Sequence, residues 1–196
     1  GGDTAMGAAY RGYAGTMLVV ITVISIPIVA HLSSRYGKIR VMKWILITSC
    51  FSDLTKWFLY TPENPNLQLL LPLLAGPTNA GFWVLVNSMK ADIPDYDEIK
   101  TGRRREGMFG AMATWIQKIG MSLSFIATGF ILDGIGFDPA KGGAQDESTL
   151  LQMRIAFIVV PAVGNILSLI FLRYYPLDEA RMYNIRKELE TRRGEI

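Results

Sequence analysis

Five long apolar segments divide the sequence, and they constrain the fold more than any other feature. They cover residues 14–32, 41–60, 67–89, 108–132 and 153–173. A helix of about 20 apolar residues crosses the hydrocarbon core of a bilayer, and a chain in hydrocarbon must satisfy its own backbone hydrogen bonds. Half of all residues are hydrophobic, and the mean hydropathy is +0.26. The sequence therefore predicts an all-α membrane protein with about five transmembrane helices.

Charges in the connections predict how the helices cross the membrane. The first and third connections and the tail at residues 177–196 are rich in Lys and Arg, whereas the second connection holds only Glu63 and the fourth is mostly acidic. Loops rich in Lys and Arg stay on the cytoplasmic side, so we predict a cytoplasmic tail, folded as a solvated helix, and an outside N-terminus. An odd number of spans with an outside start indicates that residues 1–176 are part of a larger transmembrane domain.

The densest group of charges lies between the third and fourth apolar segments, in ADIPDYDEIKTGRRREG at residues 91–107. Such a stretch cannot lie in hydrocarbon, because a charge at the centre of a membrane helix costs roughly 2.5 to 3.5 kcal/mol on insertion scales. We therefore predict a loop here, which marks the end of the membrane.

Several classes of protein do not fit the sequence. Cys50 is the single cysteine, so there is no disulfide framework and no spacing typical of metal ligands. No nucleophile with an adjacent base and no phosphate-binding loop is recognisable. The net charge of +3 comes from basic residues at the ends of apolar segments, which membrane topology explains better than nucleic-acid binding. We expect no enzyme, no metal site, no cofactor and no nucleic-acid partner.

Two opposite charges interrupt the second apolar segment. Asp53 and Lys56 are three residues apart, so in a helix they lie on one face and are close enough to pair. Pairing would lower the cost of placing both charges in the membrane. We predict either a structural ion pair or a role in gating or cation coupling.

A single cation, Lys118, lies near the middle of the fourth apolar segment. It is roughly ten residues from either end, about 15 Å at helical rise, which is far for snorkelling to the interface. No acid lies within one turn, so its counter-charge must come from another helix. Thr114 and Trp115 precede it by one turn, and Trp83 lies near the middle of the third segment. Hydroxyl and aromatic side chains of this kind suit a sugar, although Trp83 can equally be a packing residue.

Long stretches of the chain resemble a known family. FWVLVNSMKADIPDYDE and KTGRRREGMFGAMATWIQKIG, together with SIPIVAHLSSRYGKIR and YYPLDEARMYNIRKEL, are similar to the glycoside-pentoside-hexuronide:cation symporters of the major facilitator superfamily. The resemblance implies twelve helices in two halves, with the substrate bound between the halves near the bilayer midplane. This chain would supply helices eight to twelve.

The resemblance also implies functional residues and partners. Lys118 matches a lysine near the sugar and cation sites, and Trp83 matches an aromatic position close to the sugar. Thr114 and Gln117 fall on the same stretch of helix, where Trp115 departs from the family pattern. The implied partners are a sugar, a coupling cation (Na⁺ or H⁺), the bilayer of the plasma membrane and an N-terminal half that carries the cation-binding carboxylates.

For the charged stretch we predict salt bridges that gate the cytoplasmic side, or else a solvated loop that only sets topology. The acidic members are Asp92, Asp95, Asp97 and Glu98, and the basic members are Arg103, Arg104 and Arg105. The alternatives to transport are a sensor or assembly subunit that keeps the fold, or a non-functional fragment.

Overall fold

The computed structural model describes residues 4–61 and 63–194. Its elements are α1 (Thr4–Tyr36), α2 (Lys38–Leu59), η1 (Pro65–Leu70), α3 (Leu71–Thr101), α4 (Glu106–Gly134), η2 (Pro139–Lys141), α5 (Glu147–Leu172) and α6 (Glu179–Arg193). No strand occurs in these residues, so the predicted all-α class is confirmed. Residues 1–3 and 62 of the predicted transmembrane domain and residues 195–196 of the tail lie outside the described part.

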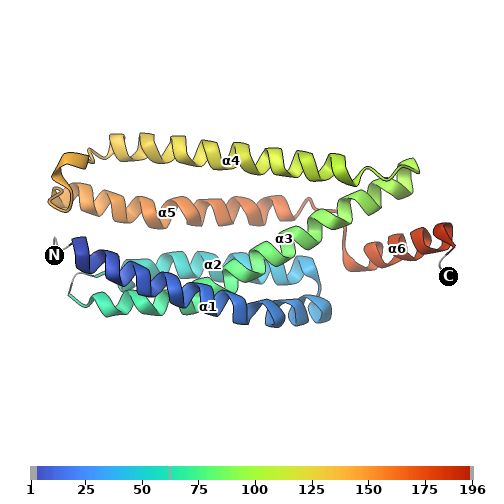
Figure 1. The fold of residues 1–196 in the computed structure, drawn as a ribbon, viewed down its shortest axis with the longest axis horizontal. Coiled ribbons are helices and arrows are strands. Elements are labelled where there is room, and N and C mark those ends of the chain that lie inside the picture. Colours follow the sequence, from blue (N-terminus) through green and yellow to red (C-terminus); the bar gives the residue numbers. More distant parts are fainter. Residues whose placement is uncertain (1–3, 62, 195–196) are drawn as a thin grey trace.

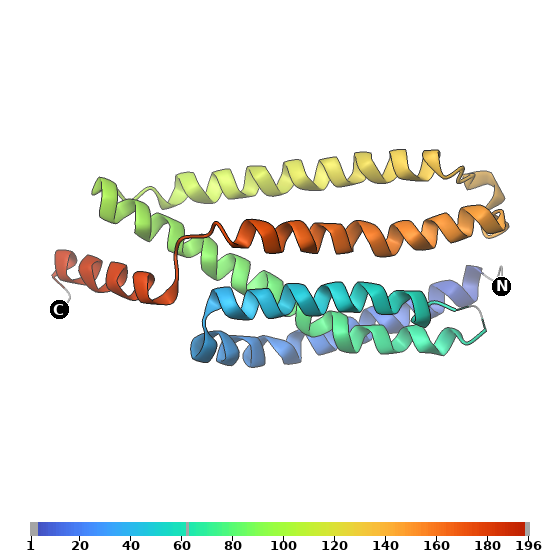
Figure 2. The same cartoon turned by 180° about the vertical axis from the view of Figure 1, so that it is seen from behind.

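The five long helices run roughly along one axis, and α6 extends beyond them at one end (Figure 1). α1, α2 and α3 pack together, and α5 lies against α2. α4 runs parallel to α5 in both views (Figures 1 and 2). All of its central residues are exposed, and no residue of α4 is buried. The chain therefore has one packed region and one long helix left largely uncovered.

Four helices of the described chain are long enough and apolar enough to span a membrane. These are Ala5–Tyr36, Pro65–Thr101, Glu106–Gly134 and Glu147–Leu172. α2 corresponds to the remaining apolar segment of the sequence but falls outside this set, and it carries Asp53 and Lys56 as well as Arg40 and Lys43. Its place among the spans therefore depends on how Asp53 and Lys56 are neutralised.

The hydrophobic core lies where α1, α2 and α3 meet. Leu85 of α3 is 1% exposed, and it packs in a cluster with residues of α2 such as Val41, Ile45 and Leu46. Small residues let these helices approach closely. A Cβ added at Gly76 of α3 would lie 2.5 Å from Cγ2 of Ile21, and 3.3 Å from that residue's backbone carbonyl carbon.

The prediction of a loop over residues 91–107 is wrong for the first two thirds of this stretch, which is helical. α3 continues through this stretch to Thr101 and ends at Gly102, which has a left-handed backbone with φ of 65°. A charged segment outside hydrocarbon can remain helical when one face is buried. Here that face includes Met89 and Asp92, and Tyr96 and Ile99 continue it onto α6. Only residues 102–105 connect α3 to α4.

The close contact at Gly76 generates a stability prediction. Gly76→Ala should destabilise the protein by about 1–3 kcal/mol, because the new methyl overpacks the α1–α3 contact against backbone. Gly164→Ala is the matched control, since a Cβ there meets nothing within 4 Å and Ala favours helix. Thermal unfolding followed by circular dichroism in detergent measures both. Equal unfolding midpoints for the two variants would contradict the packing described here.

Candidate functional site

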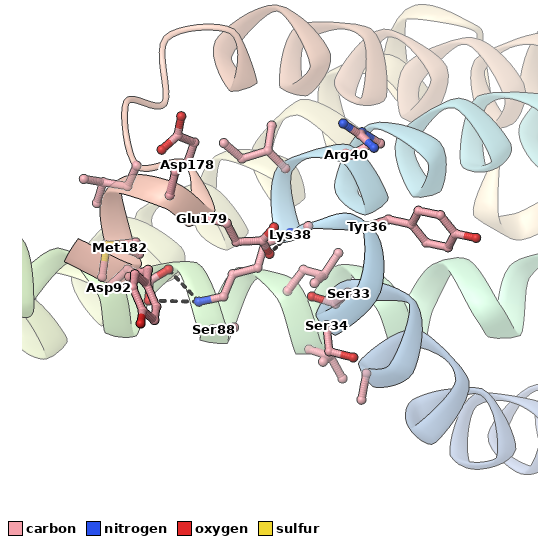
Figure 3. A pocket seen from close by; sticks show the side chains of 18 of the residues that line it. Ser33, Ser34, Tyr36, Lys38, Arg40, Ser88, Asp92, Asp178, Glu179 and Met182 are labelled. Carbon is pink, nitrogen blue, oxygen red and sulfur yellow. Dashed lines mark hydrogen bonds and ion pairs between the residues drawn. The ribbon is translucent and has the colours of Figure 1, made fainter. Parts of the chain in front are cut away.

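A buried carboxylate joins three separate elements at the α6 end of the molecule. Asp92 of α3 is 1% exposed. Its Oδ2 lies 2.6 Å from Nζ of Lys38, the first residue of α2, and its Oδ1 accepts a hydrogen bond of 2.8 Å from the Arg186 guanidinium of α6. Figure 3 shows Lys38 reaching across to Asp92. Because a buried carboxylate is costly unless it is paired, this arrangement holds α2, α3 and α6 together.

A second link runs from α6 to the turn between α1 and α2. The backbone N–H of Lys38 donates to Oε1 of Glu179 at 3.0 Å. Gly37 in this turn has φ of 97°, and a Cβ there would lie 2.5 Å from Oε2 of Glu179. The turn therefore favours glycine for its backbone, whereas the end of the Glu179 side chain can move to make room for a Cβ. A carboxylate at this position is also favourable for the N-terminus of α2.

A hydrophobic cluster also packs α6 against the rest of the protein. Leu177, Met182, Ile185 and Leu189 are buried against Tyr96, Ile99 and Tyr175. The Tyr175 hydroxyl donates to the carbonyl of Met89 at 3.2 Å. Burial, and to a smaller extent the charge of Asp92, raises the pKa of Tyr175 to about 12, so this donor keeps its proton at neutral pH. The tail is thus a docked helix rather than the fully solvated one that we expected.

The charged stretch forms two further ion pairs. Nε and a terminal nitrogen of Arg105 donate to both carboxylate oxygens of Asp97, at 2.8 and 2.5 Å. This pair raises the pKa of Arg105. Arg104 contacts Glu106 at 3.3 Å, with both side chains more than half exposed.

The predicted pairing of acids against Arg103, Arg104 and Arg105 is therefore correct for Asp97 alone among the aspartates. Asp92 pairs with Lys38 and Arg186 instead. In the described residues the carboxylate of Asp95 and the guanidinium of Arg103 have no partner, although the Thr101 hydroxyl bonds to the backbone of Arg103. The reason is that Asp92 lies on the buried face of α3, where α2 and α6 supply its cations.

In the last two turns of α2, Asp53 and Lys56 form the ion pair that their spacing predicts. Lys56 Nζ lies 2.6 Å from Asp53 Oδ1. Asn165 of α5 donates to the other oxygen of Asp53 and to the Ser49 hydroxyl, both at 3.0 Å. Nζ of Lys56 also lies 4.6 Å from the centroid of the Phe157 ring of α5. The cluster joins α2 to α5, and a gating or cation-coupling role stays a prediction.

The predicted sugar-binding residues lie on two helices that the described chain does not bring together. Lys118, Trp115 and Gln117 are exposed on α4, as is Thr114, whose hydroxyl donates to the Gly110 carbonyl at 2.9 Å. Within residues 4–61 and 63–194, no hydrogen bond or ion pair reaches Lys118. Trp83 of α3 is 46% exposed.

The ring of Trp83 lies edge-on to Phe82, with centroids 5.6 Å apart. No hydrogen bond or ring contact joins it to α4 in the residues that the structure describes. The side chains predicted to bind sugar thus face open space, and the structure shows them without a closed cavity around them.

Sequence reasoning missed Lys38 and Arg186 as partners of the buried Asp92, and Glu179 as the acceptor of the Lys38 backbone N–H. Lys38 is one of the basic residues of the first connection, which we used only to orient the helices in the membrane. Arg186 lies in the tail, which we expected to be solvated. A signal was present: Leu85, Met89, Asp92, Tyr96 and Ile99 recur at helical spacing. This stripe places Asp92 on the buried face of α3, where it needs cationic partners.

A comparison with family models matches residues 6–179 to the family described as MFS/sugar transport protein. No solved structure matches the chain significantly. Several relatives carry transporter names. The "Uncharacterized symporter YnaJ" of Bacillus subtilis (strain 168) is 29% identical over 171 residues, which are 85% of this chain and 35% of that protein.

Two further relatives show the same pattern. The "Putative glycoside/cation symporter YagG" of Escherichia coli (strain K12) is 27% identical over 84% of this chain and 35% of its own length. The "Isoprimeverose transporter" of Lactiplantibacillus pentosus is 28% identical over 83% of this chain and 33% of its own length. The chain thus spans about a third of these relatives, whose names describe transport.

The family model covers most of the chain, and the all-α architecture agrees with the resemblance carried by the sequence. The chain is therefore an all-α, multi-pass membrane protein that holds part of the major facilitator fold, and it belongs to the MFS/sugar transport family.

Proposed function

We propose that the chain is the C-terminal part of a secondary transporter that couples the uptake of a sugar to Na⁺ or H⁺ by alternating access. The observation that carries this proposal is the family match over residues 6–179. The printed names of the relatives, a putative glycoside/cation symporter and an isoprimeverose transporter among them, support a sugar and a cation as substrates. The positively charged connections support a plasma-membrane protein whose C-terminus is cytoplasmic.

In this proposal α4 faces an N-terminal half of the same transporter. Two facts support that partner. The chain spans about a third of its relatives, and α4 has no buried residue although it is apolar enough to span a membrane. An exposed span with a lysine at its centre suits the wall of a central cavity, since ionisable residues within membrane helices face the protein interior or a water-filled cavity.

Lys118 is the side chain to which we assign the central role. Its ammonium can donate three hydrogen bonds, to sugar hydroxyls or to a carboxylate of the other half that binds the cation. Occupation of the cation site would then change the field at the sugar, so that binding of each co-substrate improves binding of the other. Trp83 and Trp115 would stack on the sugar, while Thr114 and Gln117 would hydrogen-bond to it.

The ion pairs at the α6 end support a gating role. They join segments from both ends of the sequence around Asp92, and Asp97 with Arg105 closes the turn between α3 and α4. We assign them to holding the cytoplasmic side closed in the outward-open state. A single surface pair contributes up to about 1 kcal/mol, so the gate acts as a network anchored on the buried carboxylate.

Lys118→Ala in the complete transporter tests the central role of this lysine. Loss of a charged hydrogen-bond donor costs roughly 1.5–3 kcal/mol, so cation-dependent sugar uptake should fall by at least about tenfold. Uptake of radiolabelled sugar with and without a cation gradient measures both rate and coupling. Lys43→Ala removes an exposed lysine of α2 and should leave both unchanged. Wild-type uptake and coupling in Lys118→Ala would contradict the assignment.

A comparison of Arg105→Glu with Arg104→Glu tests whether the ion pair of Arg105 acts as a gate or whether any charge reversal in this turn has the same effect. Arg105 pairs bidentately with Asp97, whereas Arg104 makes an exposed contact to the nearby Glu106. Arg105→Glu should raise cytoplasmic access to the centre of α4 by up to roughly fivefold, and Arg104→Glu should not. The readout is maleimide labelling of Gln117→Cys, in a Cys50→Ser background, in inside-out vesicles. Equal labelling of both charge reversals would show that the charged stretch only sets topology.

A further inference from the structure

A second pocket lies at the end of the bundle opposite α6. It has a volume of about 710 Å³ and is bordered by α2, α4 and α5, with Arg11 of α1 at its edge. The start of α1 and the C-terminal end of α4, which lie at this end of the molecule, are visible in Figure 1. Most of the wall is hydrocarbon, including Ile131 and Leu132 of α4 and Met153 and Val160 of α5. Pockets of this size accept small molecules or part of a larger amphiphile.

The charged groups of this pocket are all cations. Arg11, Lys56 and Arg154 line it, and no acidic residue does. Lys56 is neutralised by Asp53 at 2.6 Å. Among the described residues, neither Arg11 nor Arg154 has an acidic partner. Two positive charges therefore remain uncompensated beside an apolar wall, where an unpaired charge is costly.

Arg154 is held in place by contacts that leave its charge available. One terminal nitrogen donates to the Trp57 carbonyl, and the guanidinium lies 4.6 Å from the centroid of the Trp57 ring. Its Nε is buried and has no hydrogen-bond partner in the described chain. The remaining terminal N–H groups of Arg154 have no hydrogen-bond partner in the described chain, so they can donate to a group in the pocket.

We propose that this pocket binds an anionic phospholipid. The phosphate lies between Arg11 and Arg154, since guanidinium groups match phosphate oxygens in geometry and charge. One acyl chain follows the apolar surface of α5, which continues out of the pocket as exposed hydrocarbon. Each Lys or Arg near the membrane surface adds to the attraction of an anionic headgroup. The proposal does not depend on the transported substrate.

The wall chemistry favours a lipid over other anions. A sugar carries many hydroxyls, yet Tyr60 and Thr128 are the only uncharged side chains with a hydroxyl among those that line the pocket. A small inorganic anion would use the two guanidinium groups and leave the apolar walls unoccupied. An amphiphile with a negative head and a hydrocarbon tail satisfies both parts of the pocket.

The test compares phosphatidylglycerol with phosphatidylcholine of the same acyl chains, added to the complete purified protein in detergent. Thermal unfolding midpoints report binding, and native mass spectrometry reports the lipid retained. Phosphatidylglycerol should stabilise the wild type and remain bound, whereas phosphatidylcholine should do so weakly. Arg11→Gln/Arg154→Gln should weaken the apparent affinity for phosphatidylglycerol by roughly tenfold or more.

Two further variants separate the pocket from general effects of charge or folding. Arg40→Gln/Arg173→Gln removes two exposed arginines near the other end of the bundle and should bind phosphatidylglycerol as the wild type does. Val160→Trp fills the apolar wall, keeps both cations and should also lose retention of the lipid. Equal stabilisation by the two lipids, protection by inorganic phosphate alone, or wild-type retention in both pocket variants would overturn the proposal.

Discussion

The contact between the Asp92 carboxylate and its two cations determines how the α6 end of this protein is built. A carboxylate that is 1% exposed costs several kcal/mol in lost hydration unless partners replace the water. Lys38 and Arg186 supply that replacement from the beginning of α2 and from α6. Because Asp92 lies beyond the apolar part of α3, its burial requires α3 to continue as a helix and α6 to fold back against it. The left-handed Gly37 turn and the Glu179 contact then follow from the same docking.

Charges within the apolar helices fall into two groups, and the distinction organises the functional proposals. The Asp53 and Lys56 pair is satisfied inside the chain, with Asn165 of α5 as a third member that joins α2 to α5. Lys118, Arg11 and Arg154 have no acidic partner in the described ranges. Since an uncompensated cation in or beside hydrocarbon is costly, each of these three is assigned to something outside the chain: the sugar and the other half for Lys118, and a phospholipid for the two arginines.

Much of the architecture follows from the sequence, because the length of an apolar segment and its flanking charges reflect the thickness and polarity of a bilayer. The i, i+3 spacing likewise predicts the Asp53 and Lys56 pair. The end of α3 and the docking of α6 were not predicted. Both depend on contacts between residues far apart in sequence, such as Asp92 with Arg186. Local charge density alone indicated a loop, and only the helical stripe through Leu85 and Tyr96 points to the buried face. For the sugar site, the residues come from family resemblance, since α4 has nothing packed over Lys118.

Amide hydrogen exchange in α6 tests most directly whether Asp92 holds this end of the molecule together. A helix of 15 residues is marginal in water without packing, so its amides exchange rapidly once it undocks. In Asp92→Asn the amides of residues 179–193 should exchange at least roughly tenfold faster than in the wild type, because two cations lose their buried partner. Asp95→Asn makes the same change in charge one turn further along α3 and should leave α6 protected. Equal protection of α6 in the wild type, Asp92→Asn and Asp95→Asn would contradict this account.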